Sequence, residues 1–284
     1  MQHIIERLGD YNTGFRYIHK DNGKEITDIE TLSWIKGLKI PPAYTSVKIN
    51  SNRKSKILAI GYDTKGRKQY IYNPKFIDKR SQQKYNKIIE FNHIFTAIKE
   101  QVDKDINSKD ETLRDIAVIL YLIMNCGFRV GNKSYEKQNG SFGISTIYYK
   151  HLKFNNGIVC FDFIGKKGVR NIGQCSNPHI YKILREKIKQ NVEDNPVFPN
   201  VSSKDVNTYL KKFHESITTK DLRTWNANIM FITYAKVALE NNTKNPIKKA
   251  IEQVSQKLHN TVAVCKKNYI DPDIVYTIEK KIKK

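Results

Sequence analysis

A histidine, an asparagine and a tyrosine lie within eleven positions of one another in KLHNTVAVCKKNYIDP, residues 257–272. A tyrosine hydroxyl becomes a nucleophile when neighbouring groups activate it, and His259 and Asn260 are the neighbours that could contact the substrate of Tyr269. Helical spacing also places Tyr269 on one face with Cys265, which is typical of a tyrosine at the edge of a core. The pattern alone leaves both interpretations of Tyr269 open.

Three cations elsewhere in the chain are candidates for contacts with an anionic substrate. Arg129 follows Gly127, which we expect to stop an apolar helix, and Lys166 lies in GKKG, the turn of a predicted hairpin. Arg223 lies in the first turns of a predicted helix, where free backbone N–H groups and the helix dipole attract phosphate. Surface charges are common at such places, so position alone assigns these residues no role.

Helical patterns surround most of these residues. Apolar stripes repeat in LRDIAVILYLIMN, in LRTWNANIMFITYAKVALE and in PIKKAIEQVSQKL, and Thr218 and Asp221 have capping-box spacing before the second of these segments. The run 158–164 predicts a buried strand that leads into the GKKG turn. Asn260 lies where a left-handed C-terminal cap often occurs, and Thr261 can cap the short helix that follows.

The beginning of the chain has a different pattern. Short β-prone segments, FRYIHK, SVKIN, KILAIGYD and KQYIYN, are separated by turn signals. Residues 36–80 contain twelve Lys or Arg residues against two acids, Asp63 and Asp78. We predict an α+β protein with a small, mostly antiparallel β domain at residues 1–81 and a larger, mainly α-helical domain with a small β-hairpin sheet at residues 82–284.

The overall charge indicates a polyanionic partner. The 50 Lys and Arg residues against 28 Asp and Glu give +22 in 284 residues, and a hydrophobic content of 39% is enough for a packed core beneath that charge. No apolar run approaches the roughly 20 residues that cross a bilayer. Acids in MQHIIERLGD argue against a signal peptide. We expect an intracellular protein with no membrane association.

Metal and cofactor sites are not indicated. The four cysteines, at positions 126, 160, 175 and 265, have no CxxC spacing and lie in or beside apolar runs, which favours buried free thiols. The sequence contains no HExxH, Walker A or GxGxxG motif. We expect neither a metal nor a cofactor.

The segment RKQYIYNP is a candidate contact with nucleic acid. Strand alternation places Gln69 on one face and both Tyr70 and Tyr72 on the other. A glutamine amide can pair with adenine through two hydrogen bonds, and Arg67 and Arg80 supply charge for phosphates. A tyrosine pair packed on a core face explains the same pattern equally well.

Five motifs taken together resemble one family. GFRVGNKSY, FIGKKG, KDLRTW and NTVAVCKKNYIDP occur in the order and approximate spacing of the small type IB DNA topoisomerases of poxviruses, bacteria and giant viruses. Upstream, DTKGRKQYIYNP resembles the N-terminal strand with which these enzymes contact DNA. The resemblance covers nearly the whole chain. It implies a DNA-binding first domain and a catalytic second domain of the fold shared by tyrosine recombinases and type IB topoisomerases.

The resemblance implies an isomerase that relaxes supercoiled DNA. Tyr269 matches the tyrosine that attacks a backbone phosphodiester, forms a 3′-phosphotyrosine link and frees a 5′-hydroxyl, after which the strand rotates and is resealed. The covalent intermediate conserves the energy of the broken bond, so the reaction requires no ATP, no redox cofactor and no obligatory metal.

Three cations match other catalytic positions of the family. Arg129 and Arg223 match two arginines whose guanidinium groups stabilise the negative charge that develops on the phosphate. Lys166 matches the general acid that protonates the departing 5′-oxygen, and the adjacent Lys167 is its rival for this role.

An asparagine matches the last catalytic position. Asn260 lies nine residues before Tyr269, where the family contacts phosphate with histidine in poxviruses and asparagine in bacterial-type relatives. His259 is therefore one residue out of register. Asn132 and Ser134 replace part of a more basic stretch of the poxvirus relatives, so we do not expect pyrimidine-motif specificity like theirs.

The resemblance also implies the contacts with DNA. They map onto Arg67, Gln69, Tyr70, Tyr72 and Arg80 in the first domain and onto Tyr135 and Lys220 in the second. The expected partner is double-stranded DNA, around which a monomer closes as a two-domain clamp. Abundant Lys, Asn and Ile suggest an AT-rich genome, and if the source is a virus we expect packaging in the virion.

Three alternative functions remain open at this point. Tyrosine recombinases use the same chemistry but usually carry His-x-x-Arg where this chain has KDLR, and they have a helical first domain. A noncatalytic nucleic-acid-binding protein would show salt-sensitive binding without a covalent adduct. A nuclease would require paired carboxylates for magnesium, which the sequence does not suggest.

Overall fold

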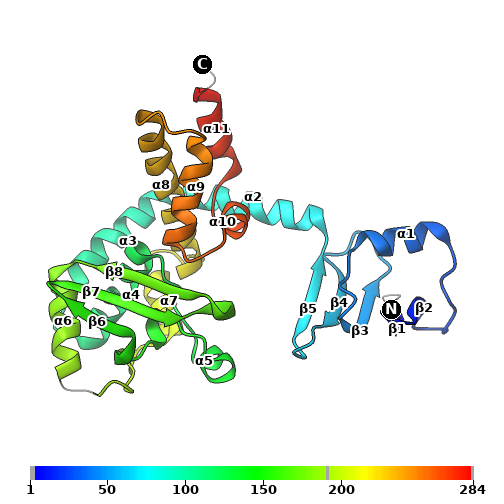
Figure 1. Cartoon of the computed structure of the whole chain (residues 1–284), viewed down its shortest axis with the longest axis horizontal. Coiled ribbons are helices and arrows are strands. Elements are labelled where there is room, and N and C mark those ends of the chain that lie inside the picture. The colour runs from blue at the N-terminus through cyan, green and yellow to red at the C-terminus, as the bar shows by residue number, and fades with distance from the viewer. Residues whose placement is uncertain (1–3, 190–191, 283–284) are drawn as a thin grey trace. The chain divides into compact units, whose positions relative to one another are not determined.

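Two structural units divide the chain in the computed structural model, Met1–Lys84 and Tyr85–Lys284 (Figure 1). The structure describes residues 4–189 and 192–282. Helix α2 (Pro74–Glu90) begins in the first unit and ends in the second. The predicted boundary after residue 81 lies within this helix.

The first unit is an antiparallel sheet with one helix. Its strands follow the order β2-β1-β3-β4-β5, and buried side chains including Ile5, Ile35 and Ile49 form its core. The four β-prone segments form β2 to β5, as predicted, whereas β1 and the short helix were not predicted. The elements are β1 (Ile4–Asp10), β2 (Gly14–His19), α1 (Ile29–Gly37), β3 (Thr45–Asn50), β4 (Ile57–Tyr62) and β5 (Lys68–Tyr72).

The second unit is mainly helical, which confirms the predicted α+β class. A small antiparallel sheet, in the order β6-β7-β8, lies beside the helices. The helices are α3 (Asn92–Asp105), α4 (Glu111–Cys126), α5 (Lys133–Asn139), α6 (Pro178–Lys189), α7 (Ser203–Lys211), α8 (Thr219–Glu240), α9 (Pro246–Lys257), α10 (Val262–Asn268) and α11 (Pro272–Ile282). The strands are β6 (Leu152–Asn155), β7 (Ile158–Ile164) and β8 (Arg170–Cys175).

Helix α4 lies in the main core of the second unit. Ten of its residues are buried, so it is apolar on nearly all sides, as expected of an internal helix. Asp110 caps its first turn by accepting a hydrogen bond from the Leu113 N–H. Gly127 ends the helix in the left-handed conformation, with φ 69°, as the sequence predicts.

A second core joins the C-terminal helices. Residues of α8 and α9, such as Phe231 and Val254, pack with Leu258, Cys265 and Ile270. The predicted caps are confirmed: Thr218 and Asp221 form a capping box at the start of α8, and Thr261 caps α10. These caps determine where α8 and α10 begin, and with them the places of the candidate residues on both helices.

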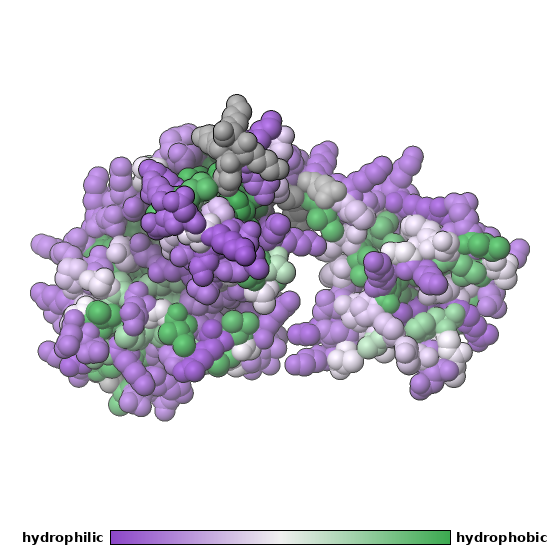
Figure 2. All heavy atoms as spheres, turned by 45° about the horizontal axis from the view of Figure 1, so that its top comes forward, coloured by the Kyte–Doolittle hydropathy of each residue, from purple (hydrophilic) through white to green (hydrophobic). Residues whose placement is uncertain are grey.

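The surface agrees with the composition. Hydrophilic residues cover most of the face seen in Figure 2, as the excess of Lys and Arg predicts. Among the described residues, no helix has both the length and the apolar character needed to cross a membrane. All four cysteines are free thiols; Cys126, Cys175 and Cys265 are buried as predicted, whereas Cys160 is partly exposed.

The end of α4 provides a test of this packing. A Cβ added at Gly127 would lie 2.1 Å from the Lys257 carbonyl oxygen, whereas a Cβ at Gly140, the left-handed cap of α5, would meet no atom within 4 Å. Gly140→Ala should cost about 1–2 kcal/mol because of its left-handed backbone. Gly127→Ala should cost clearly more, because the end of α9 must also move. Urea denaturation of both variants measures the difference, and equal losses would contradict this packing.

Candidate active site

The backbone at Arg129 and Val130 is hydrogen-bonded to the backbone at Ile144 and Ser145. The Ile144 N–H donates to the Arg129 carbonyl at 2.8 Å, and the Ser145 N–H donates to the Val130 carbonyl at 2.7 Å. The guanidinium Nη2 donates to Asn260 Oδ1 at 2.6 Å. The two residues are 131 positions apart in the chain, so the fold joins the end of α4 to the loop before α10.

Arg223 lies on the buried side of α8. Its side chain is 3% exposed, and its Nη2 donates to the Leu258 carbonyl at 2.9 Å. Its Nε and Nη1 are also buried but have no hydrogen-bond partner among the described residues. Burial, together with the neighbouring Arg129, lowers the pKa of Arg223 to about 10, although Tyr269 acts in the opposite direction. Arg223 therefore remains charged at neutral pH.

Tyr269 lies at the end of α10 against Arg223. Its side chain is 8% exposed, and the Arg223 guanidinium carbon lies 5.2 Å from the centroid of the tyrosine ring. The Tyr269 N–H donates to the Cys265 carbonyl at 2.9 Å. The predicted nucleophile thus lies next to a buried cation that is only partly paired.

His259 and Asn260 have different surroundings. His259, not Asn260, adopts the left-handed conformation, with φ 52°, so the predicted cap position was wrong by one residue. The His259 Nε2–H donates to the Cys126 carbonyl at 3.1 Å, and its ring stacks on Phe128 with centroids 5.3 Å apart. Burial lowers the pKa of His259 to about 4, so the ring is neutral at neutral pH.

The Asn260 side chain contacts Arg129. Its Oδ1 accepts the hydrogen bond from Arg129, while its Nδ2 is buried without a partner in the described part of the chain. The structure therefore brings Arg129, Arg223, Asn260 and Tyr269 into one region. The buried atoms of this region that have no partner among the described residues, Arg223 Nε and Nη1 and Asn260 Nδ2, are all hydrogen-bond donors.

Lys166 lies in the turn between β7 and β8. The turn is closed by the Gly165 N–H, which donates to the Val169 carbonyl at 2.7 Å. Lys167 has φ 64°, and both lysines are exposed. Within the described residues, no hydrogen bond joins Lys166 to the arginines, Asn260 or Tyr269. The turn between β7 and β8 was predicted correctly.

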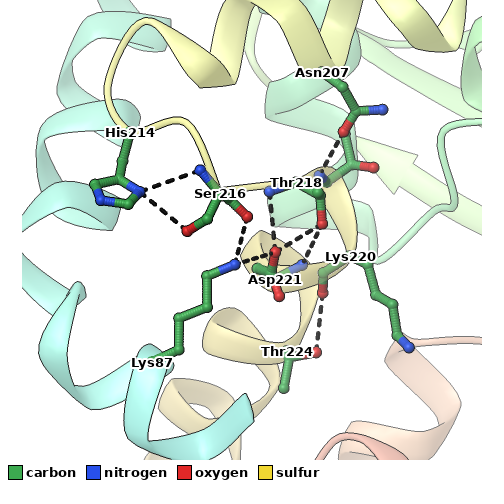
Figure 3. A network of polar contacts seen from close by, with 9 residues as sticks. Lys87, Asn207, His214, Ser216, Thr218, Lys220, Asp221 and Thr224 are labelled. Carbon is green, nitrogen blue, oxygen red and sulfur yellow. Dashed lines mark hydrogen bonds and ion pairs between the residues drawn. The ribbon is translucent and has the colours of Figure 1, made fainter. Parts of the chain in front are cut away.

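The start of α8 differs from the expectation of free N–H groups for phosphate (Figure 3). The Thr219 N–H donates to Asn207 Oδ1 at 3.0 Å, and the Asp221 N–H donates to Thr218 Oγ1 at 3.4 Å. Both groups are satisfied within the protein, so that expectation was wrong for these two donors. The Lys220 side chain points away from the network and is exposed.

The predicted DNA contacts of the first unit lie on and beside β5. Asp63 Oδ2 accepts hydrogen bonds from Arg67 Nε and from Gln69 Nε2, both at 2.9 Å. The rings of Tyr70 and Tyr72 stack with centroids 6.0 Å apart. These side chains are at least partly accessible. The side chain of Arg80 lies outside the described residues.

In the second unit, the remaining predicted contact is Tyr135. It lies on α5 and is 56% exposed.

Among the described residues, no group of three or more His, Cys, Asp or Glu side chains could hold a metal.

Sequence reasoning missed Asn228, which holds the backbone around Tyr269. Its side chain is 3% exposed; its Nδ2 donates to the Tyr269 carbonyl at 2.9 Å, and its Oδ1 accepts from the Asp271 N–H at 2.8 Å. A polar amide within the apolar helix that carries Arg223 was the available signal. Buried amides usually need such partners.

Two family models match parts of this chain. Residues 73–284 match the family described as "Eukaryotic DNA topoisomerase I, catalytic core", and residues 14–63 match "Bacterial DNA topoisomerase IB, N-terminal domain". A DNA topoisomerase 1B of Acanthamoeba polyphaga mimivirus is 31% identical, over 98% of this chain and 88% of the relative. A DNA topoisomerase 1 of rabbit fibroma virus is 27% identical, over 84% of this chain and 79% of the relative.

A solved structure, the XerH site-specific recombinase bound to DNA after cleavage, aligns with a TM-score of 0.43 and 15% identity. The alignment covers 67% of this chain and 50% of the recombinase. The likeness to that recombinase is therefore distant, whereas the family match covers the whole second unit. The chain belongs to the type IB DNA topoisomerase family.

Proposed function

We propose that Tyr269 is the nucleophile of this topoisomerase and that Arg129, Arg223 and Asn260 bind the phosphate that it attacks. A type IB enzyme relaxes supercoiled DNA by transient cleavage of one strand through a 3′-phosphotyrosine intermediate, strand rotation and religation. The assignment of residues to these steps is our proposal.

The unpaired donors beside Tyr269 carry this proposal. Removing a charged group from water costs several kcal/mol unless hydrogen bonds and opposite charge compensate. Within the part of the chain that the structure describes, Arg223 has one hydrogen bond, to the Leu258 carbonyl, and two buried nitrogen atoms without partners. Asn260 Nδ2 is in the same condition. A phosphodiester would supply both the missing acceptors and the missing negative charge.

The same donors suit the transition state. As Tyr269 Oη gives up its proton to solvent and bonds to phosphorus while the bond to the 5′-oxygen breaks, negative charge builds up on the non-bridging oxygens of a five-coordinate phosphorus. Because Arg223 is buried and held by a backbone carbonyl, it can stabilise this charge with little reorganisation. Arg129, already bonded to Asn260, can contact a second oxygen.

Lys166 is proposed as the proton donor to the departing 5′-oxygen. A lysine ammonium can release a proton, whereas a guanidinium effectively cannot. Lys166 lies on an exposed turn, so we propose that the turn moves toward the phosphate when DNA binds. Lys167 shares the turn, but its left-handed backbone directs it differently.

We also propose which side chains bind DNA outside the reaction centre. Arg67 supplies a cation and Gln69 supplies an amide. Tyr70 supplies an aromatic ring, and the Lys68 Nζ lies 5.6 Å from the centroid of that ring. Tyr72 and Arg80 complete the set in the first unit, and Tyr135 and Lys220 in the second. We propose a monomer that acts on double-stranded DNA inside cells and, if the source is a virus, is also packaged in the virion.

The central test removes one oxygen atom. Tyr269→Phe should abolish both the relaxation of supercoiled plasmid and the detergent-trapped protein–DNA adduct, in EDTA and without ATP, because no nucleophile remains. Tyr276→Phe, which alters an exposed tyrosine of α11, should retain both activities. Relaxation by Tyr269→Phe would show that the nucleophile is another residue. Exchange between two specific sites without relaxation would instead indicate a recombinase.

Substitutions at Asn260 and at His259 test which of these two neighbours contacts the phosphate. Asn260→Ala removes a phosphate donor and should slow cleavage by roughly 10²-fold, as loss of one donor to a developing oxyanion does elsewhere. His259→Asn retains a residue type that tolerates the left-handed backbone and should cleave at nearly the normal rate at neutral pH. Rates of covalent adduct formation measure both, and the reverse ranking would mean that His259 contacts the phosphate.

The pH dependence of stability gives the His259 variant a second readout. The pKa of His259 is about 4 in the folded protein and 6.5 without its surroundings. Its contribution to stability is thus fully present above pH 6.5 and is lost as the pH falls toward 4, because only the unfolded state takes up the proton. His259→Asn should remove this part of the pH dependence in urea denaturation. An unchanged dependence would mean that His259 is not held neutral.

A further inference from the structure

The last part of α2 contacts the segment that carries Tyr269. Tyr85 is 3% exposed, and its hydroxyl donates to the Ile270 carbonyl at 2.6 Å. Burial raises the pKa of the Tyr85 hydroxyl, and the nearby Asp271 and Cys265 raise it further, so the group stays protonated and remains a donor. A residue of α2 thus binds the peptide unit that directly follows Tyr269.

Tyr85 and Asn228 hold this segment together. Asn228 binds the Tyr269 carbonyl and the Asp271 N–H, and Tyr85 binds the Ile270 carbonyl between them. Ile270 is itself 1% exposed. Three consecutive residues therefore have backbone hydrogen bonds to buried side chains, one on α8 and one on α2.

A second contact joins α2 to the start of α8 (Figure 3). Lys87 Nζ donates to the Ser216 carbonyl at 2.5 Å and to Asp221 Oδ2 at 2.9 Å. The same oxygen of Asp221 accepts from the N–H and the hydroxyl of Thr218. Lys87 thereby connects α2 to the capping box of the helix that carries Arg223. The end of α2 has polar contacts both to that helix and to the Tyr269 segment.

We propose that Tyr85 is a positioning residue for the transesterification, and that its hydrogen bond to Ile270 holds the Tyr269 backbone in line with the phosphate next to Arg223. This inference rests on the proposed role of Tyr269. In-line attack is sensitive to geometry, and a displacement of about 1 Å can cost roughly 10²-fold in rate. The Tyr269 ring lies against the Arg223 guanidinium, and Tyr85 and Asn228 bind the backbone carbonyls of Ile270 and Tyr269. Loss of the Tyr85 hydrogen bond would therefore allow this backbone to shift.

The test compares two tyrosines that each donate one hydrogen bond from a buried ring. Tyr85→Phe removes the bond to Ile270. Tyr209→Phe removes a bond of 2.7 Å to Asp105, between α7 and α3, and that side chain is 4% exposed. Both variants keep the ring and lose one hydroxyl. The comparison therefore separates the effect on Tyr269 from a general loss of stability.

Three quantities are measured for each variant. They are the single-turnover rate of covalent adduct formation at saturating duplex DNA, the Kd for the same DNA in a Tyr269→Phe background, and the urea midpoint. Tyr85→Phe should lower the rate about tenfold or more with Kd unchanged within twofold. Tyr209→Phe should leave the rate and the Kd within twofold of the unsubstituted protein, even if its urea midpoint falls as far as that of Tyr85→Phe. Equal rates for the two variants, or a loss that follows the urea midpoint in both, would overturn the proposal.

A modified substrate separates positioning from proton transfer. A sulfur atom in place of the bridging 5′-oxygen leaves without a proton, so it should restore cleavage to Lys166→Ala. It should not restore cleavage to Tyr85→Phe, because the defect lies in the approach of the nucleophile; restoration would count against the proposal. Adduct formation by Tyr269→Phe would refute the proposed function itself, whereas normal cleavage by Tyr85→Phe would refute this inference alone.

Discussion

The structure depends on one incompletely paired charge, the Arg223 guanidinium. The group is almost fully buried, remains charged at neutral pH and, among the described residues, has one hydrogen bond, to the Leu258 carbonyl. An uncompensated buried cation is costly, and folded proteins rarely keep one without a reason. Tyr269 lies against this guanidinium. In our proposal a phosphate bound here compensates the charge, and the cost of burying it in the free protein becomes binding energy when DNA binds.

The surrounding elements serve this arrangement in different ways. The capping box at Thr218 determines the phase of α8, and so directs Arg223 into the interior. The left-handed Gly127 allows the chain to turn from α4 toward Arg129 beside the end of α9. The carbonyl of Leu258, the residue that caps α9, accepts the hydrogen bond from Arg223. His259 stacks on Phe128, binds the Cys126 carbonyl and stays neutral.

Local signals allowed much of the second unit to be predicted. A capping box, a glycine stop and a glycine-bounded lysine turn are each determined by short-range chemistry, so α8, the end of α4 and the β7–β8 turn could be anticipated. The roles of Tyr85 and Asn228 could not, because they depend on contacts between residues 185 and 41 positions apart. The left-handed His259 was missed because the adjacent Asn260 is the residue type that more often ends a helix in this conformation. The strand β1 and helix α1 have few buried residues to mark them.

The most direct measurement of the central claim is a crystal structure with nicked duplex DNA and orthovanadate, which can bridge Tyr269 Oη and the 5′-oxygen in a five-coordinate geometry. Arg223 Nε or Nη1 and Asn260 Nδ2 should then lie about 3 Å from the non-bridging vanadate oxygens, so that each donor without a partner gains one. If Arg223 instead keeps only the Leu258 carbonyl while other residues hold the vanadate, the buried charge has no role in binding the phosphate and the account is wrong.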